Sequence, residues 1–306
     1  MFPVIPANSS AVEASTNSEG IFAFGTVTGY TATMVSTSNL VSDAGVVATD
    51  TTGVGSARMH LQGTEYGGDK GIFAYGYTGS NVSMSNLVSN SGVVADDTTG
   101  VGETRRYVGA CGYGTDKGIF GYGTPNGGHT AVTNLVSNVG VVSTDVSGVG
   151  TARSNLAAVE YGVDKGLFGY GWVTGADGVS MTNLVSNVGV VASDTTGVGT
   201  ARFHLAACKF GTGKAIFGFG SDGSKVSMTN LVSNTGVVAD DTTGVGTARA
   251  YFSACEYGND KGIFGFGTGD AGVTAISNKV SNVGVVASDT SGVGTARFGL
   301  DACSFN

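Results

Sequence analysis

The stretch that decides the fold is residues 201–249, which read ARFHLAACKFGTGKAIFGFGSDGSKVSMTNLVSNTGVVADDTTGVGTAR. Glycine and asparagine turns divide it into short apolar or alternating runs. We name them run a (LAACKF, 205–210), run b (KAIFGFG, 214–220), run c (VSMTNLVS, 226–233) and run d (GVVAD, 236–240). In run c, Val226, Met228 and Val232 alternate with serine and threonine, which is the two-residue period of a β-strand. Because no stretch shows a helical period, we predict an all-β protein.

Near copies of this unit fill the chain. Each copy ends in an arginine that closes GVGTAR or a variant of it, and the steps between arginines are 47, 48, 49, 47 and 48 residues: Arg58, Arg105, Arg153, Arg202, Arg249 and Arg297. Four strands in a unit of about 48 residues are typical of a propeller blade. A single blade cannot bury both of its faces, so we expect six blades packed face to face around an axis.

The two ends of the repeat array complement each other. The first repeat begins at SEGIFAFG (18–25), which is run b without a run a, and the chain closes with run a of RFGLDACSFN (297–306) without a run b. We therefore predict, over residues 18–306, a six-bladed β-propeller of four-stranded antiparallel blades, closed by pairing of residues 298–306 with the first blade. Residues 1–17 belong to no blade and are predicted to form an extended N-terminal arm.

The repeat resembles the kelch repeat over residues 18–306. An arginine, a short apolar strand, and KGIFGYG (117–123) in the place of the kelch kIYvfGG carry the resemblance. The kelch diglycine is replaced by Gly-Tyr-Gly at 121–123 and Gly-Phe-Gly at 218–220, and the usual strand c Tyr and strand d Trp do not occur. The resemblance thus implies a propeller fold more than a function.

The blade sequence TNLVSNVGVVASDTTGVGTAR (182–202) is also similar to blades of tail-associated proteins of tailed bacteriophages. This resemblance implies a component of a virion. It is an analogy, since function belongs to sites and not to folds.

Charge and hydropathy exclude several classes of partner. The formal net charge is −8, and the 15 Lys and Arg residues are scattered along the repeats, so no basic stripe is available for nucleic acid or an anionic membrane. No apolar run approaches the roughly 18 to 20 residues that cross a bilayer. The first residues, MFPVIPANSSAVEAS, lack the features of a secretory signal, so export is not expected.

Residues that occur in every repeat are expected to build the scaffold. An aspartate lies eight residues before each arginine: Asp50, Asp97, Asp145, Asp194, Asp241 and Asp289. Calcium binding in these loops would require six to eight oxygens with several carboxylates, whereas most copies offer one carboxylate. We expect instead that the aspartate caps its turn and that the arginine binds loop carbonyls between blades. No metal and no cofactor are predicted.

The cysteines and histidines do not form a catalytic or zinc-binding pattern. Cys111, Cys208, Cys255 and Cys303 each lie six residues after a repeat arginine, where the other repeats have Thr64 and Val159. Equivalent positions on separate blades rarely allow a disulfide, so this is predicted to be a slot for a small residue with free thiols. The three histidines lie in three different repeats, and no Ser-His-Asp or Cys-His set is evident. An enzyme is not predicted.

The repeats differ at two places, the connection between runs b and c and the residue pair after the arginine. In an up-and-down blade both places lie on one face of the disc, which is where recognition is usually located. The aromatic and histidine side chains there are the predicted ligand-binding residues: Tyr30, Tyr77, Tyr107, His129, Trp172, Phe203, His204, Tyr251 and Phe298. Alternatively, Phe203 and Phe298 plug a central channel, Trp172 packs on its own loop, or the variation is drift.

Aromatic rings among small polar residues suit a glycan or a protein surface. The predicted function is a non-enzymatic virion component of a tailed phage, made in the host cytoplasm, that contacts a host-surface glycan or receptor and binds other virion proteins through residues 1–17. The alternative is a lectin-like or scaffolding propeller in the bacterial cytoplasm or at its surface. A glycan-active enzyme ranks third, because its two carboxylates would have to come from Asp177, Asp222 and Asp270 on separate blades.

Overall fold

The computed structural model describes residues 17–28, 33–176 and 178–306. All regular structure in these ranges is β-strand and they contain no helix, so the all-β prediction is confirmed. Most strands form three-stranded antiparallel sheets, which we number 1 to 6 in chain order. Their strands are β2 (Ser38–Val41), β1 (Glu19–Ala23) and β20 (Asp301–Phe305); β3 (Gln62–Tyr66), β4 (Lys70–Ala74) and β5 (Ser85–Val88); β6 (Gly109–Tyr113), β7 (Lys117–Gly121) and β8 (Thr133–Val136); β9 (Ala157–Tyr161), β10 (Lys165–Gly169) and β11 (Thr182–Val185); β12 (Ala206–Phe210), β13 (Lys214–Gly218) and β14 (Thr229–Val232); β15 (Ser253–Tyr257), β16 (Lys261–Gly265) and β19 (Ser277–Val280). A short hairpin of β17 (Thr268–Gly269) and β18 (Gly272–Val273) follows β16.

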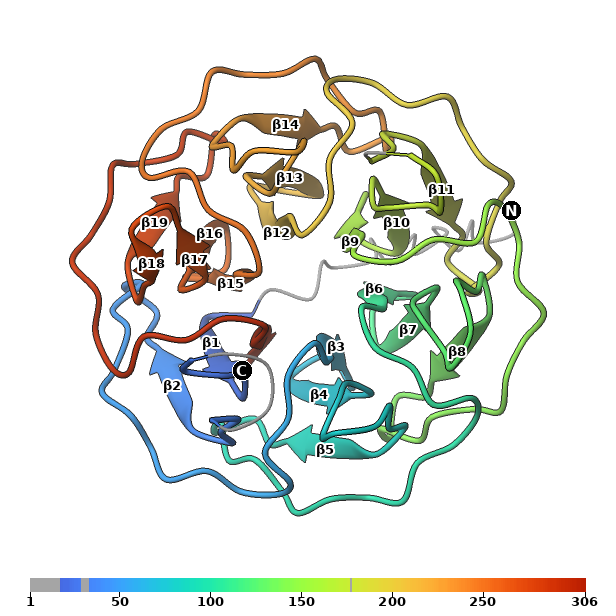
Figure 1. Ribbon diagram of the computed structural model, residues 1–306, viewed down its shortest axis with the longest axis horizontal. Coiled ribbons are helices and arrows are strands. Elements are labelled where there is room, and N and C mark those ends of the chain that lie inside the picture. The colour runs from blue at the N-terminus through green and yellow to red at the C-terminus, as the bar shows by residue number, and fades with distance from the viewer. Residues whose placement is uncertain (1–16, 29–32, 177) are drawn as a thin grey trace, which may run out of the picture.

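The sheets stand side by side around a central axis, with the run a strands innermost and the run c strands outermost (Figure 1). Each sheet buries apolar side chains against its two neighbours, so the core is divided into layers between adjacent sheets. In one layer the rings of Tyr170 from sheet 4 and Phe217 from sheet 5 lie 5.2 Å apart in an edge-to-face arrangement. This packing is the physical reason why one repeat cannot fold alone.

Each sheet has three strands where the sequence predicted four, because run d does not form a continuous ladder. In sheet 1 run d contacts β2 through two isolated bridges, Val41 with Val47 and Ser38 with Thr51. Between these bridges the side-chain amide of Asn39 donates a hydrogen bond of 2.9 Å to the carbonyl of Ala48. A side chain thus takes a carbonyl that a fourth strand would use, and the same arrangement recurs in the other sheets.

The two ends of the repeat array pair with each other. Strand β20 lies antiparallel to β1 in a register that runs from Glu19 opposite Phe305 to Ala23 opposite Asp301. The backbone N–H of Ser18 also donates to the carbonyl of Asn306 at 3.0 Å. The pairing of residues 298–306 with 18–25 that the sequence predicted is therefore present. Apart from Asn17, the predicted arm over residues 1–17 lies outside the described residues.

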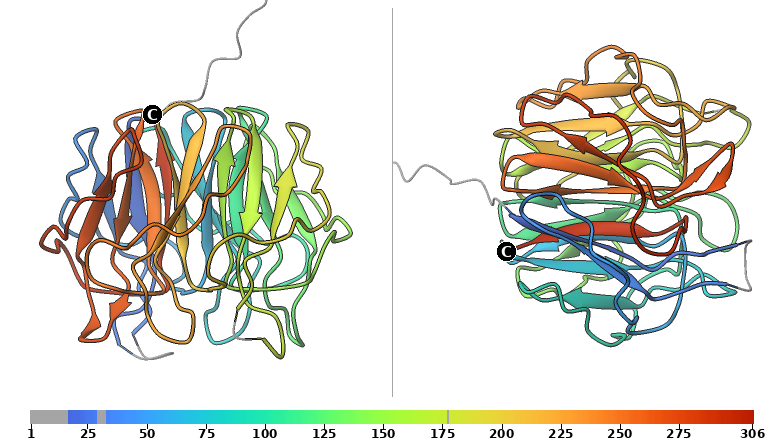
Figure 2. Two further views of the ribbon diagram at one scale, coloured as in Figure 1. Left: turned by 90° about the horizontal axis from the view of Figure 1, so that it is seen from above. Right: turned by 90° about the vertical axis from the view of Figure 1, so that its left-hand side faces the viewer.

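The molecule has two distinct faces. The face that we call constant carries the a–b turns, the c–d turns and the C-terminus, and the face that we call variable carries the b–c connections (Figure 2). Backbone hydrogen bonds of 2.8–3.1 Å join each a–b turn region to the next around the constant face: Gly67 to Asp116, Gly114 to Asp164, Gly162 to Gly213, Gly211 to Asp260, Gly258 to Ser18 and Asn306 to Asp69. This series passes through all of the sheets and returns to its start.

A buried arginine lies at every junction between sheets, and all of these arginines have an exposed fraction of 0%. The guanidinium of Arg202 lies 4.4 Å above the ring of Tyr170 in sheet 4, and its Nε donates to the carbonyl of Phe219 in sheet 5 at 2.9 Å. Its own carbonyl accepts from the N–H of Gly171 at 3.0 Å. All of the repeat arginines stack in this way on an aromatic ring at 4.2–4.6 Å. The arginine therefore connects two sheets through its ring contact and its hydrogen bonds.

The repeated aspartate strengthens the same junction. The carboxylate of Asp241 accepts hydrogen bonds from the N–H of Thr200 (2.9 Å), the Thr200 hydroxyl (2.7 Å) and the Asn230 amide (2.9 Å). Thr200 belongs to the segment that enters from the preceding sheet, so this aspartate caps a loop across the junction. Burial by itself would raise the pKa of Asp241, but these hydrogen bonds and the charge of Arg202 outweigh it and lower the pKa below its usual value.

We predict that Asp241→Ala lowers the free energy of unfolding by about 2 kcal/mol, since it removes several hydrogen bonds to one carboxylate. Asp240→Ala, at the exposed neighbouring position, is the control and should change stability by less than about 0.5 kcal/mol. Chemical denaturation at pH 7 measures both. Because the pKa of Asp241 is lowered, its contribution is present above the unfolded carboxyl pKa of about 4 and is lost as the pH falls. An equal effect of the two changes would contradict this role.

Candidate ligand-binding face

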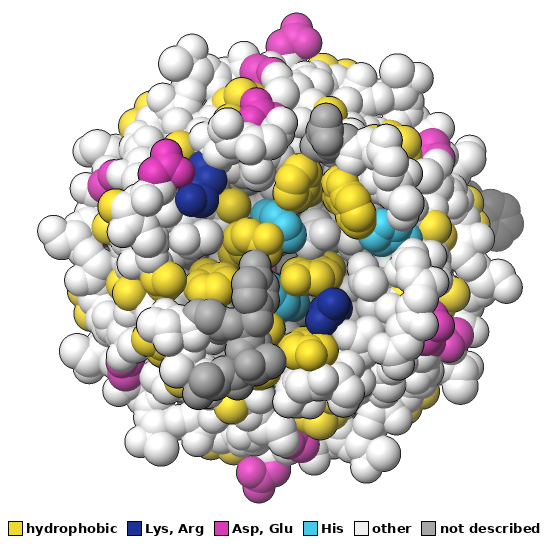
Figure 3. Space-filling model, in the orientation of Figure 1, with side chains coloured by type: hydrophobic (Ala, Val, Ile, Leu, Met, Phe, Trp, Pro, Cys, Tyr) yellow, Lys and Arg dark blue, Asp and Glu magenta, His cyan; other side chains and the backbone are white. Residues whose placement is uncertain are grey.

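The predicted ligand-binding residues that the structure describes all lie on the variable face, either at its axis or on the connections around it. Tyr30 lies outside the described residues. Hydrophobic and histidine side chains gather around the axis of this face, and acidic side chains lie toward its rim (Figure 3). The described residues that the sequence predicted for one face lie on that face, where they form an axial cluster, an outer pair and the separate Tyr77.

The axial cluster is built on a cycle of backbone hydrogen bonds. The second residue after each repeat arginine donates its N–H to the carbonyl of the equivalent residue in the preceding repeat, at 2.7–3.2 Å: His60 to Gly299, Tyr107 to His60, Asn155 to Tyr107, His204 to Asn155, Tyr251 to His204 and Gly299 to Tyr251. These residues share a φ of 54–61°, the left-handed region that non-glycine residues rarely adopt. Inter-sheet geometry thus holds one residue of each repeat beside the axis, and all of these except Gly299 present a side chain there.

The rings of the axial cluster are in mutual contact. His204 and Tyr251 are stacked with centroids 3.7 Å apart, and His60 lies 4.3 Å from Tyr107. Phe203 contacts His204 edge to face at 4.9 Å, and Phe298 contacts Tyr251 at 5.9 Å. The two phenylalanines therefore flank the axial rings. The cluster surrounds a small cavity of about 60 Å³.

His60 belongs to this cluster although the sequence did not single it out. It occupies the same slot as Tyr107, His204 and Tyr251, and that equivalence is the signal that could have found it. Burial, with a smaller effect of the Arg106 charge, lowers the pKa of His60 to about 3. Burial also lowers the pKa of His204 well below its usual value. Both imidazoles are therefore neutral near pH 7, so they offer ring faces and hydrogen-bonding nitrogens but no positive charge.

The outer pair consists of Trp172 and His129. Their rings meet edge to face with centroids 5.0 Å apart, and they come from the b–c connections of the adjacent sheets 4 and 3. The sequence left open the alternative that Trp172 packs on its own loop. In the structure its ring also contacts His129, which belongs to another loop. Tyr77 lies elsewhere on the face, under the guanidinium of Arg106 at 4.7 Å. Arg106 is a second residue that the sequence did not single out.

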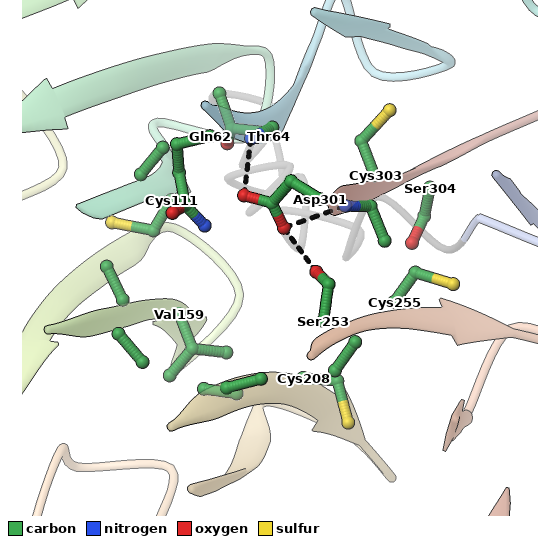
Figure 4. Close-up of a pocket in the computed structure, with 18 of the residues that line it drawn as sticks. Gln62, Thr64, Cys111, Val159, Cys208, Ser253, Cys255, Asp301, Cys303 and Ser304 are labelled. Carbon is green, nitrogen blue, oxygen red and sulfur yellow. Dashed lines mark hydrogen bonds between the residues drawn. The ribbon is translucent and has the colours of Figure 1, made fainter. Parts of the chain in front are cut away.

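A central channel runs behind the axial cluster, lined by the innermost strands. Its enclosed part has a volume of about 90 Å³. Asp301 points into it, where its carboxylate accepts hydrogen bonds from the N–H groups of Gly63 (3.0 Å) and Ala302 (2.7 Å) and from the Ser253 hydroxyl (Figure 4). Burial raises the pKa of Asp301 to about 7 in spite of these bonds.

The cysteines lie around the same channel, with thiols that point away from its centre (Figure 4). They are free and buried. Each faces a glycine of the next sheet: a methyl group built on Gly20, for example, would lie 2.5 Å from Sγ of Cys255. The prediction of a slot for a small residue is confirmed, because the glycine leaves room for a thiol and little more.

Nearer the constant face, one lysine meets carboxylates from three sheets. The ammonium of Lys209 lies 3.5 Å from Glu65, 3.2 Å from Glu160 and 3.1 Å from Glu256. Lys209, Glu160 and Glu256 line a cavity of about 430 Å³ together with the a–b turns of sheets 4, 5 and 6. The lysine and these glutamates all lie seven residues after a repeat arginine, where alternate repeats carry glutamate. None of these charged residues was predicted from the sequence to belong to a site.

Burial sets the protonation of this charged cluster. It raises the pKa of Glu256 to about 8, against the opposing effect of Lys209, and it raises the pKa of Glu160 for the same reason. Burial would lower the pKa of Lys209, but the attraction of the carboxylates outweighs it and raises that pKa well above its usual value. The lysine therefore stays charged and is the counter-ion on which the buried glutamates depend.

Comparison with known proteins assigns no family, since no protein-family model and no curated protein matches the chain. Within the described ranges, no group of three or more His, Cys, Asp or Glu side chains is arranged to hold a metal ion. Those ranges also hold no helix of the length and apolarity needed to span a membrane. The function is therefore argued from the geometry of the two faces.

We predict that Lys209→Met destabilises the protein more at pH 8 than at pH 5. The substitution leaves buried glutamates without a counter-ion, which costs roughly 3 to 5 kcal/mol when they are ionised. A carboxyl whose folded pKa is raised loses stability as the pH rises from the unfolded value of about 4 through the folded value, and protonation at pH 5 relieves this loss.

Denaturation at both pH values measures this effect. Lys214→Met is the matched control, because Lys214 is an exposed residue at the start of β13 and should show no such pH dependence. If Lys209→Met were equally destabilising at both pH values, the lysine would act through packing and not through its charge.

Proposed function

We propose that the chain is a non-enzymatic binding protein whose variable face contacts a host-surface glycan and whose constant face attaches to a tailed-phage virion as a fibre, decoration or tail-associated component. The observation that carries this proposal is the difference between the faces. The turns of the constant face have nearly the same sequence in every repeat. The variable face instead presents aromatic, histidine and arginine side chains that differ from repeat to repeat. Exposed residues that differ among copies of one scaffold are those that a ligand can select.

The scaffold that we propose is a six-bladed, kelch-like β-propeller. Sheets that surround one axis, the pairing of β1 with β20, and hydrogen-bond series that return to their starting sheet support it. Such a disc is rigid, so its ligand-binding groups are positioned before the ligand arrives. Preorganisation of this kind reduces the entropy lost on binding.

A binding role is favoured over catalysis by the chemistry of the variable face. A hydrolase of glycans requires a pair of carboxyl groups about 5 to 10 Å apart. Of the loop aspartates described on this face, Asp270 is paired with Lys225 at 3.2 Å, and Asp222 binds the backbone of its own turn. The neutral histidines and the tyrosines are suited to stacking and hydrogen bonding with sugar hydroxyls.

The constant face has features that suit attachment to another protein. An exposed valine recurs in every c–d turn with an exposed fraction of 60–64%: Val46, Val93, Val141, Val190, Val237 and Val285. The turn uses the backbone of this residue, as when Ser42 N–H donates to the Val46 carbonyl at 3.0 Å, and does not require an apolar side chain. Solvent-exposed apolar side chains that recur at equivalent positions are typical of interaction surfaces. Asn17, where the chain enters from residues 1–16, lies at an a–b turn of this same face.

We predict that Trp172→Ser and Tyr251→Asn each weaken glycan binding by about tenfold or more, because each removes a stacking surface. Both replacements occur at the equivalent position of another repeat, Ser221 and Asn155, so the scaffold should accept them. A glycan array followed by calorimetry measures binding, and Val188→Ser on the constant face is the control. If no sugar binds, or if the variants bind as the parent does, the proposal for this face fails.

Attachment is tested separately. We expect the full chain to co-purify with phage particles on a density gradient, and a chain without residues 1–16 to remain unbound, because Asn17, which follows them in the chain, lies at the constant face. Immunoblotting of the gradient fractions measures incorporation. Trp172→Ser should be incorporated normally, since it alters only the opposite face. Equal incorporation of the full and shortened chains would overturn the proposed role of the segment.

A further inference from the structure

Arg106 is a cation on the variable face that the scaffold does not use. Its slot, the first after the repeat arginine, holds Met59, Ser154, Phe203, Ala250 and Phe298 in the other repeats, so no charge is needed there. Nε of Arg106 has no hydrogen-bond partner within the described ranges, a property that it shares with Nε of Arg105 and Arg249. Those two residues are fully buried at sheet junctions, whereas Arg106 is only partly buried. Its guanidinium lies over the rings of Tyr77 at 4.7 Å and Tyr107 at 5.4 Å.

The other loop cation of this face is already neutralised. Lys225 donates to the carbonyl of Gly269 at 3.0 Å and pairs with Asp270 at 3.2 Å. Figure 3 shows a basic side chain beside the histidines at the axis and another farther out, next to an acidic side chain, while acidic side chains are mostly at the rim. On a protein with a formal net charge of −8, a guanidinium that forms no ion pair with any described residue and lies beside an aromatic cluster is suited to an anionic ligand.

A second observation also points to a ligand at the axis. Nε2 of His60 and Oδ1 of Asn155 are buried polar atoms without a hydrogen-bond partner among the described residues. Both residues line the axial cavity, and the side chain of His60 is 5% exposed. A buried polar atom that lacks a partner costs free energy, and a polar ligand or a water that it orders removes this cost.

The ring contacts join Arg106 to these atoms. Its guanidinium covers Tyr107, Tyr107 contacts His60 at 4.3 Å, and His60 contacts Tyr251 at 5.8 Å. From these contacts we infer that the axis of the variable face binds an acidic saccharide, with the sugar carboxylate on the guanidinium of Arg106 and the sugar ring on the axial aromatic cluster. The planar fork of arginine matches the two oxygens of a carboxylate. This inference rests on the proposed function and specifies its ligand class.

The test uses the full chain and a panel of uronic-acid and sialic-acid oligosaccharides, each paired with its uncharged methyl ester. We expect binding to the acids and at least about tenfold weaker binding to their esters. Arg106→Met keeps an unbranched side chain and should reduce binding of the acid to the level of the ester. Arg106→Lys keeps the charge without the planar fork and should give an intermediate affinity.

Lys225→Gln is the matched control, because it removes a cation of the same face that is already paired, and its affinity should remain within about twofold of the parent. Thermal unfolding of all variants shows whether each is folded. Equal binding of acids and esters, or no effect of Arg106→Met, would overturn the acidic ligand while leaving the glycan-binding proposal standing. Failure of every sugar, charged and uncharged, would overturn both.

Discussion

The structure depends on a charged group that is fully buried at each junction between sheets. The guanidinium of Arg202 is removed from water, and burial lowers the pKa of such arginines, to about 10 for Arg249. This desolvation is offset by an aromatic face on one side and by carbonyl and amide acceptors on the other. Because the ring belongs to one sheet and the acceptors to the next, the arginine is satisfied only when two sheets are docked. Folding of a repeat and docking of its neighbour are thereby coupled.

The same constraint separates the repeated residues from the variable ones. At the junction of Arg202, the arginine donates to Asn230, whose amide donates to Asp241, and the three residue types recur at the same positions of every repeat. The aromatic residue before the last glycine of run b has a φ of 57–65°, which places its ring under the arginine. Side chains outside this network and outside the apolar core between sheets are the ones that differ among the repeats, and on the variable face they gather around the axis.

The channel adds a constraint that the sixfold repeat does not require. Glu65, Glu160 and Glu256 come from alternate sheets and share Lys209 as their cation. Sheets that do not touch one another are therefore linked by one ammonium group. The free-energy cost of burying each of these charged groups is offset only by its ion pairs with the others. The cluster is therefore sensitive to pH and to the loss of any member. The charged cluster lies toward the opposite end of the channel from the axial aromatic cluster, so its protonation affects the packing of the innermost strands and not the variable face.

The sequence by itself determined the all-β class, the period of the repeat, the pairing of the two chain ends and the residues of the variable face, because each depends on patterns that recur every two or every 48 or so residues. It could not determine that run d stays outside the sheet, since Asn39 competes for the Ala48 carbonyl only once both lie side by side. Nor could it find the axial roles of His60 and Arg106 or the meeting of Lys209 with glutamates from three other repeats. Those contacts join residues about 30 or more positions apart, and only the arrangement of the sheets around an axis makes them neighbours.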